Sequence, residues 1–103
     1  MNTLNFLVIG KNKEILDTLK RIIENNEGWN AEIQNDENGC YDYIKENQVD
    51  IVLLSSGLEE QFEKEIKVFC ENLDKEVKVI DHYGGGSGLL KNEVYALFPN
   101  LQP

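Results

Sequence analysis

The sequence predicts one α/β domain built around a parallel sheet. Short, continuous apolar runs alternate with longer segments of helical periodicity, and the chain has 103 residues, which is the length of one domain. Strands that alternate with helices form parallel sheets covered by helices and joined by right-handed crossovers. The predicted order is β-α-β-α-β-α-β-α, with the domain over residues 1–98 and a tail over residues 99–103.

The first half of the chain contains two predicted strands and two predicted helices. Asn5–Gly10 is a continuous apolar strand closed by glycine, and Lys13–Asn26 places its leucines and isoleucines on one helical face. Asn30–Gln34 alternates weakly between apolar and polar residues, which indicates an edge strand. Turn residues fill Asn35–Gly39, and a short helix begins at Cys40.

The second half repeats the alternation. Ile51–Leu54 is the most apolar run, which is typical of a central parallel strand covered on both faces. Glu59–Asp74 has one apolar stripe and reads as an amphipathic helix. Val77–Ile80 is the fourth strand, Gly84–Gly88 is a glycine-rich turn, and Leu89–Phe98 is a last helix that ends before a proline.

The composition excludes several classes of function. Nineteen acidic residues oppose ten basic ones, for a formal net charge of −9, so we expect no binding to nucleic acid or to anionic membranes, both of which require a basic surface. Cys40 and Cys70 lack the spacing of a zinc site, and no metal or cofactor is predicted. We find no run of signal-peptide or transmembrane character, and the sequence favours a reduced, cytoplasmic protein.

Two stretches carry a resemblance to a known family. NGCYDYIKENQVDIVLLSSG, at residues 38–57, resembles the second helix and third strand of a response-regulator receiver domain. NFLVIGKNKEILDTLKRIIE, at residues 5–24, resembles the first strand and helix of the same family. The resemblance implies a three-layer, flavodoxin-like (receiver-like) fold. The four strands of this chain would then form a parallel sheet in the order 2-1-3-4, without the family's fifth strand.

The resemblance also implies that phosphotransfer is lost. Ser55 stands where the family has its phosphate-accepting aspartate, and residues 10–12 (GKN) stand where it has a pair of metal-binding acids. The family's hydroxyl residue after strand four falls near His82 or Tyr83, and its lysine after strand five has no counterpart. Phosphorylation of an aspartate requires a carboxylate nucleophile and a divalent cation. The chain is therefore predicted to be a truncated pseudo-receiver that is not phosphorylated on aspartate.

A small site at the carboxyl edge of the sheet is the alternative. Open α/β sheets bind ligands at this edge, and the third and fourth strands should bring a serine and the chain's single histidine there. A serine nucleophile needs a partnered base and an oxyanion hole. The same serine could instead cap a turn or the following helix. The candidate ligand-binding residues are Ser55, Ser56, His82, Gly84, Gly85, Gly86, Ser87 and Gly88.

The glycine-rich turn has two interpretations. Backbone N–H groups of such a loop can hold a phosphate at a helix N-terminus. The spacing of Gly84–Gly88 matches neither the dinucleotide fingerprint nor a Walker loop, so a small anion or phosphorylated ligand is the predicted class. The other interpretation is a flexible turn, with Ser87 as the cap of the last helix or with another chain close to the backbone.

The missing fifth strand predicts association. Val77–Ile80 would be an apolar edge strand, and either it or Leu89–Phe98 could pair with a second copy in a two-fold homodimer. Alternatively, the last helix covers the side of the first helix and closes a compact monomer. The sequence therefore favours a non-catalytic regulatory or protein-interaction module. The alternative function is a small anion-binding protein, or an enzyme, that uses Ser55, His82 and Gly84–Gly88.

Overall fold

A computed structural model describes residues 3–36, 39–55 and 58–83 of the chain. Within these ranges, four strands alternate with three helices, and all four strands are parallel in the order β2-β1-β3-β4. The predicted α/β fold and strand order are confirmed, and the topology is flavodoxin-like. The elements are β1 (Leu4–Ile9), α1 (Lys13–Glu24), β2 (Trp29–Gln34), α2 (Gly39–Glu46), β3 (Ile51–Ser55), α3 (Glu60–Glu71) and β4 (Lys78–Tyr83).

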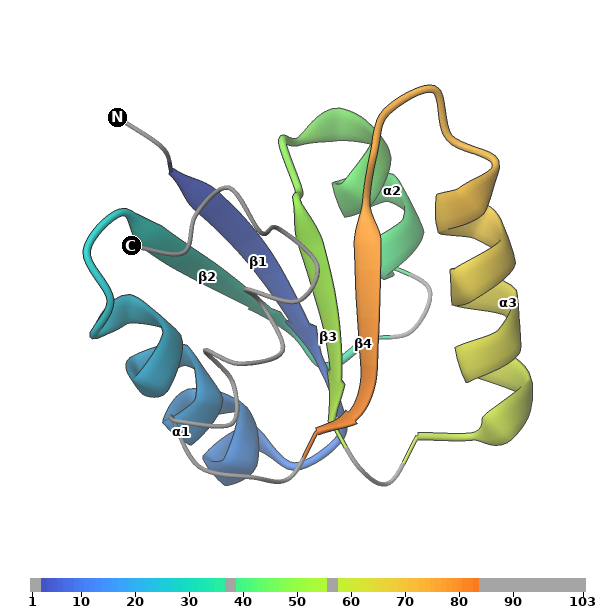
Figure 1. Cartoon of the computed structure of the whole chain (residues 1–103). Helices are drawn as coiled ribbons and strands as arrows, with labels where there is room; N and C mark the ends of the chain where they lie inside the picture. The colour runs from blue at the N-terminus through green and yellow to red at the C-terminus, as the bar shows by residue number, and fades with distance from the viewer. Residues whose placement is uncertain (1–2, 37–38, 56–57, 84–103) are drawn as a thin grey trace.

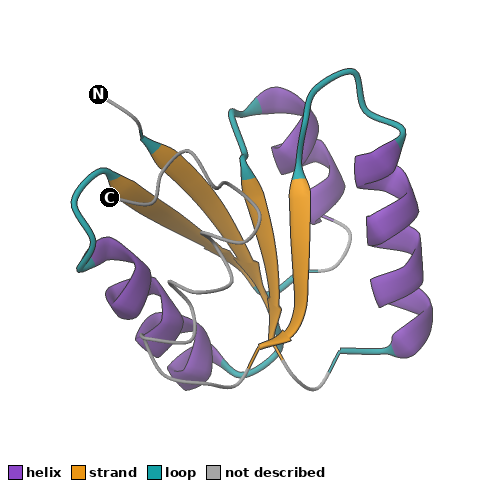
Figure 2. Ribbon diagram, in the orientation of Figure 1, coloured by secondary structure: helices purple, strands orange, loops and turns teal. Residues whose placement is uncertain are grey.

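The described elements form three layers. Figures 1 and 2 show the sheet in the middle, with α1 on one face and α2 and α3 on the other. Alternate residues of each strand point to opposite faces, so neighbours such as Val8 and Ile9 belong to different apolar clusters. One cluster joins the sheet to α1, and the other joins it to α2 and α3. The two clusters account for the continuous apolar runs of the central strands, since each strand must be apolar on both faces.

β1 and β3 form the centre of the sheet. Every residue of β3 is buried, and Leu7, Val8 and Ile9 of β1 are fully buried. β1 pairs with β2 from Leu4 opposite Trp29 onward, and with β3 from Phe6 opposite Ile51 onward. These central strands fix where the carboxyl edge of the sheet lies.

The boundaries of β1, β2 and β3 differ from the predicted ones by one residue, and those of β4 differ by more. β4 begins at Lys78 and continues to Tyr83, three residues beyond the predicted end at Ile80, because its pairing with β3 continues through a register shift to Ser55 opposite Tyr83. His82, which was predicted to follow the strand, therefore lies inside it. β2 begins one residue early, at Trp29, whose ring centroid lies 5.4 Å from that of Phe6.

The helix ends follow local chemistry. α1 ends at Glu24, two residues earlier than predicted, and Asn25 is its C-cap. Gly28 has a φ of 84°, a left-handed conformation that favours glycine, and its carbonyl accepts a hydrogen bond from Leu4 N at 2.9 Å. No helix in the described part of the chain is both long and apolar enough to cross a membrane. The predicted last helix Leu89–Phe98, the Gly84–Gly88 turn and the 99–103 tail lie outside the described residues.

Candidate functional site

The carboxyl edge of the sheet is the first place to look for a site. The chain leaves β1 through α1 toward β2 on one side, whereas β3 lies on the other side of β1. This is the topological switch point at which open α/β sheets bind ligands. The four arrowheads point toward this edge, at the bottom of Figure 1. Gly10 directly follows β1, Ser55 ends β3, and Tyr83 ends β4.

Ser55 packs directly against Gly10. The serine is 2% exposed, and a Cβ atom built on Gly10 would overlap Ser55 Oγ and lie 3.2 Å from Ser55 Cβ. The same Cβ would lie 2.9 Å from Leu16 Cδ2 of α1. Glycine is therefore required at position 10 because of the space available. The serine side chain fills the volume that a side chain at the end of β1 would need.

Asn12 has a structural role where the resembling family has an acid. Its backbone is extended, and its Oδ1 accepts a hydrogen bond from Ile15 N at 3.2 Å, which caps α1. Lys13 in the same turn pairs with Asp17 at 3.0 Å on the exposed face. Residues 10–12 thus supply a close strand contact, an exposed lysine and a helix cap.

Two buried or hydrogen-bonded carboxylates near β3 and α3 do not form a metal site. Asp50, which precedes β3, accepts from Asn5 N at 2.9 Å at the opposite, amino edge of the sheet. Glu63, in the first turns of α3, is 5% exposed. Within residues 3–36, 39–55 and 58–83, no three or more His, Cys, Asp or Glu side chains are grouped so that they could hold a metal ion.

Neither cysteine forms a disulfide, and both are buried. The pKa of the Cys70 thiol is raised from 9.0 to about 11. Burial is the largest cause, the nearby charge of Glu71 adds to it, and Lys75 partly opposes the shift. The thiolate is the reactive form of cysteine. Cys70 is therefore an unreactive core residue at neutral pH.

The structure describes only part of the predicted ligand site. Ser55 lies at the expected end of β3, and the pairing places Tyr83, not His82, opposite it. His82 belongs to β4, but its side chain is not described. Ser56, Gly84, Gly85, Gly86, Ser87 and Gly88 lie outside the described residues. The gathering of these groups around one ligand remains a prediction.

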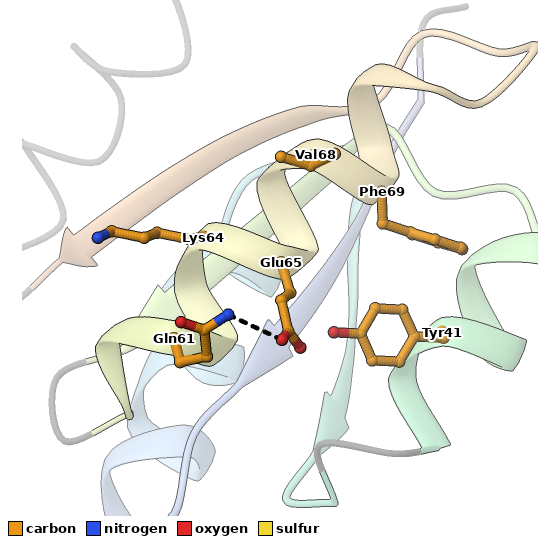
Figure 3. A pocket seen from close by; sticks show the side chains of 6 residues that line it. All are labelled: Tyr41, Gln61, Lys64, Glu65, Val68 and Phe69. Carbon is orange, nitrogen blue, oxygen red and sulfur yellow. Dashed lines mark hydrogen bonds between the residues drawn. The ribbon is translucent and has the colours of Figure 1, made fainter.

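Sequence reasoning missed a pocket on another surface. It lies between α2 and α3, has a volume of about 520 Å³, and is lined by Tyr41, Gln61, Lys64, Glu65, Val68 and Phe69 (Figure 3). The sequence offered one signal, which is that Val68 lies beside the apolar stripe of α3. In the structure the side chain of Val68 is 55% exposed. A large apolar residue that lies outside the buried stripe widens the apolar surface of the helix toward solvent.

Comparison with known proteins adds no function. No family model, curated protein or solved structure matches the chain. The described residues thus offer a carboxyl edge filled by a buried serine, and an open apolar pocket between two helices. The first arrangement leaves little room for a reacting group beside Ser55. The second is an open hollow whose apolar residues are bordered by polar and charged side chains.

Proposed function

We propose that this chain is a non-catalytic, receiver-like module that acts by binding other protein surfaces and is not phosphorylated on aspartate. The observation that carries the proposal is the packing of Ser55 against Gly10. A phosphate acceptor at the end of β3 would need a carboxylate with access to solvent and to a divalent cation. A serine that is 2% exposed and packed on the neighbouring strand end meets neither requirement.

The residues around this position support the same conclusion. Asn12 is engaged in capping α1, Lys11 is exposed beside it, and neither can supply the carboxylate oxygens that hard cations prefer. Among the described strands, β4 lies at one side of the order β2-β1-β3-β4. Its predicted role as an edge through which two copies associate is part of this proposal.

The test combines a chemical and a ligand challenge. The full chain is incubated with acetyl phosphate and Mg²⁺ and its intact mass is measured, and thermal melting is followed with a panel of nucleotides and phosphosugars. We expect no phosphorylated species and no shift in melting temperature. A ligand at a hundred times its Kd would stabilise the fold by about 2.7 kcal/mol, which melting detects.

Two outcomes would overturn the proposal. Phosphorylation that depends on Mg²⁺ would show that the chain still accepts a phosphoryl group. A shift in melting temperature that Gly86→Val abolishes would favour the small-anion site. Light scattering on the same samples tests the association through β4. A mass equal to one chain at micromolar concentration would remove self-association from the proposal and leave binding to a different protein.

A further inference from the structure

The pocket between α2 and α3 has an apolar floor that the described residues leave open. The ring of Tyr41 from α2 meets the ring of Phe69 from α3 edge to face, with centroids 4.9 Å apart and planes at 86°. Val68 continues the floor and is 55% exposed, more than Ile15 on α1, the other exposed large apolar residue of the described ranges. Exposed apolar surface of this kind marks an association site when it is bordered by polar groups.

The charged side chains at the border of the pocket differ in their partners. Lys64 already pairs with Glu60 at 3.3 Å, and Lys45 Nζ lies 5.8 Å from the centre of the Phe69 ring. The Glu65 carboxylate accepts a hydrogen bond from the neutral amide of Gln61 at 3.0 Å, and within the described part of the chain it pairs with no cation. Figure 3 shows this carboxylate on the same side of the pocket as the Tyr41 hydroxyl.

The two helices that form the pocket have a negative net charge. α2 and α3 together contain six acidic and three basic side chains, and the whole chain has a formal net charge of −9. A second acidic copy of this chain is disfavoured here, because like charges oppose association. An anionic membrane is disfavoured for the same reason. The complement of this surface has an apolar group to fill the floor and a cation to meet Glu65.

From these contacts we infer that the α2–α3 pocket binds a basic segment of a different protein, with an apolar side chain against Tyr41, Val68 and Phe69 and a lysine or arginine paired with Glu65. The inference rests on the proposed interaction function and names the surface that performs it. A pocket of about 520 Å³ that is open on one side suits side chains presented by a protein segment better than an enclosed small molecule. Apolar anchors in a groove between helices are a common mode of segment recognition.

A random peptide library displayed on phage tests the inference without a known partner. The full wild-type chain is the bait, and selected peptides are synthesised and titrated against matched variants. We expect the selected peptides to combine an apolar residue with lysine or arginine. Val68→Asp should weaken their binding at least about tenfold, and Glu65→Gln should weaken it severalfold, with less dependence on salt than the wild type shows.

Matched controls lie on the opposite face of the domain. Ile15→Asp introduces the same charge at the other exposed apolar residue, and Glu14→Gln removes an exposed carboxylate from the first turn of α1. Both variants should bind the selected peptides as the wild type does. Urea denaturation of each variant shows whether it is folded, and Val68→Gln replaces the aspartate variant if that one is unstable.

Three results would overturn the inference: selection of no peptide above background, selection of acidic peptides, or equal weakening by Val68→Asp and Ile15→Asp. Peptides that bind β4 instead would show that the α2–α3 pocket is not the binding site, and the proposed interaction function would still hold. Phosphorylation by acetyl phosphate with Mg²⁺ would instead remove the proposed function, whatever the peptides do. The two failures are therefore distinguishable.

Discussion

The carboxyl edge of the sheet and the α2–α3 pocket differ in what fills them. At the edge, where this fold type places its ligands, a serine side chain occupies the space beside Gly10 and is 2% exposed. Between α2 and α3, where the fold type prescribes no site, Val68 is 55% exposed beside two aromatic rings. The comparison teaches that the position of a site in a fold does not determine its use, because side chains of the chain itself can fill it.

The same difference appears in the polar groups. The hydroxyl and amide groups at the edge serve the fold, since Asn12 caps α1 and Ser55 packs on the neighbouring strand end. The carboxylate of Glu65 at the pocket meets only the amide of Gln61 among the described residues. Groups that are committed to the fold leave little for a ligand, whereas Glu65 keeps hydrogen-bonding capacity for one.

Replacing Ser55 by aspartate should give the largest change in the free energy of unfolding. A small change would mean that the carboxyl edge is open to solvent, as the α2–α3 pocket is. We expect Ser55→Asp to lower the free energy of unfolding by about 3–5 kcal/mol at pH 7, because the new carboxylate is buried and displaces the packing against Gly10. Burial raises the pKa of the introduced carboxyl above its unfolded value, so the loss should grow as the pH rises above about 4. Urea denaturation between pH 4 and 7 measures it.

Ser55→Asn is the control for size, since it adds a side chain of similar volume without charge. The asparagine variant should lose stability by an amount that does not change with pH over the same range. Equal stability of the two variants at pH 7 would show that the edge is solvated. In that case a carboxylate could act there, and the acetyl phosphate experiment should be repeated on the aspartate variant.

The contact between the two strand ends predicts the next effect. Gly10→Ala should cost about 1–3 kcal/mol of unfolding free energy, because the new Cβ overlaps Ser55 Oγ and approaches Leu16. The cost should fall by about 0.5 kcal/mol or more in a Ser55→Ala background, where the hydroxyl is gone and only the longer contacts with Leu16 Cδ2 and the Cβ of residue 55 remain. Denaturation of the single and double variants gives the coupling energy.

Gly39→Ala provides the matched control at the start of α2. Its new Cβ would meet only ordinary contacts, the nearest being Asp36 Oδ2 at 3.4 Å, and alanine favours helix over glycine. This variant should be neutral or slightly more stable than the wild type. Additive effects of Gly10→Ala and Ser55→Ala would contradict the direct packing of the two strand ends.

The sequence alone predicted the architecture because the fold depends on apolar periodicity. The continuous apolar run at Ile51–Leu54 predicts a strand whose side chains are buried on both faces of a sheet. The structure places this strand at the centre of a parallel sheet. The stripe of α1 was confirmed in part, since Leu16, Leu19 and Ile23 are buried, whereas Ile15 of the same predicted face is 42% exposed. Patterns of this kind indicate the alternating strands and helices of a layered α/β fold. The strand order was implied by the family resemblance and not by the periodicity.

The site was less predictable, for two physical reasons. The fourth strand looked shorter than it is because Asp81 and His82 are polar, whereas strand pairing depends on backbone hydrogen bonds that polarity does not reveal. The pocket joins Tyr41 of α2 to residues of α3, and the contact depends on how two helices lie side by side on the sheet. One-dimensional patterns report which face of a helix is apolar, and they do not report which neighbouring helix leaves part of it uncovered.

Cys70 provides the smallest predicted change in the free energy of unfolding. It tests whether the inner face of α3 is as dry as the outer pocket is open. This thiol lies on the buried face of the helix whose outer face forms the pocket, and it is 3% exposed. Burial, with the charge of Glu71 adding to it, raises the pKa of Cys70 from 9.0 to about 11. The folded state therefore keeps the thiol neutral at a pH where the unfolded chain has ionised it. The stabilisation is present below pH 9 and is lost as the pH rises toward 11.

The measurement is the free energy of unfolding of the wild type and of Cys70→Ala in urea at pH 8 and pH 10. Lysines and tyrosines also titrate in this range, so the test is the difference between the two proteins and not the decline of either one. The alanine variant has a constant loss from its smaller side chain, and it retains Cys40. We expect the wild type to lose about 1.4 kcal/mol more than the variant over this interval. Equal losses would mean that water reaches the inner face of α3, and the contrast between a dry inner face and an open outer pocket would then fail.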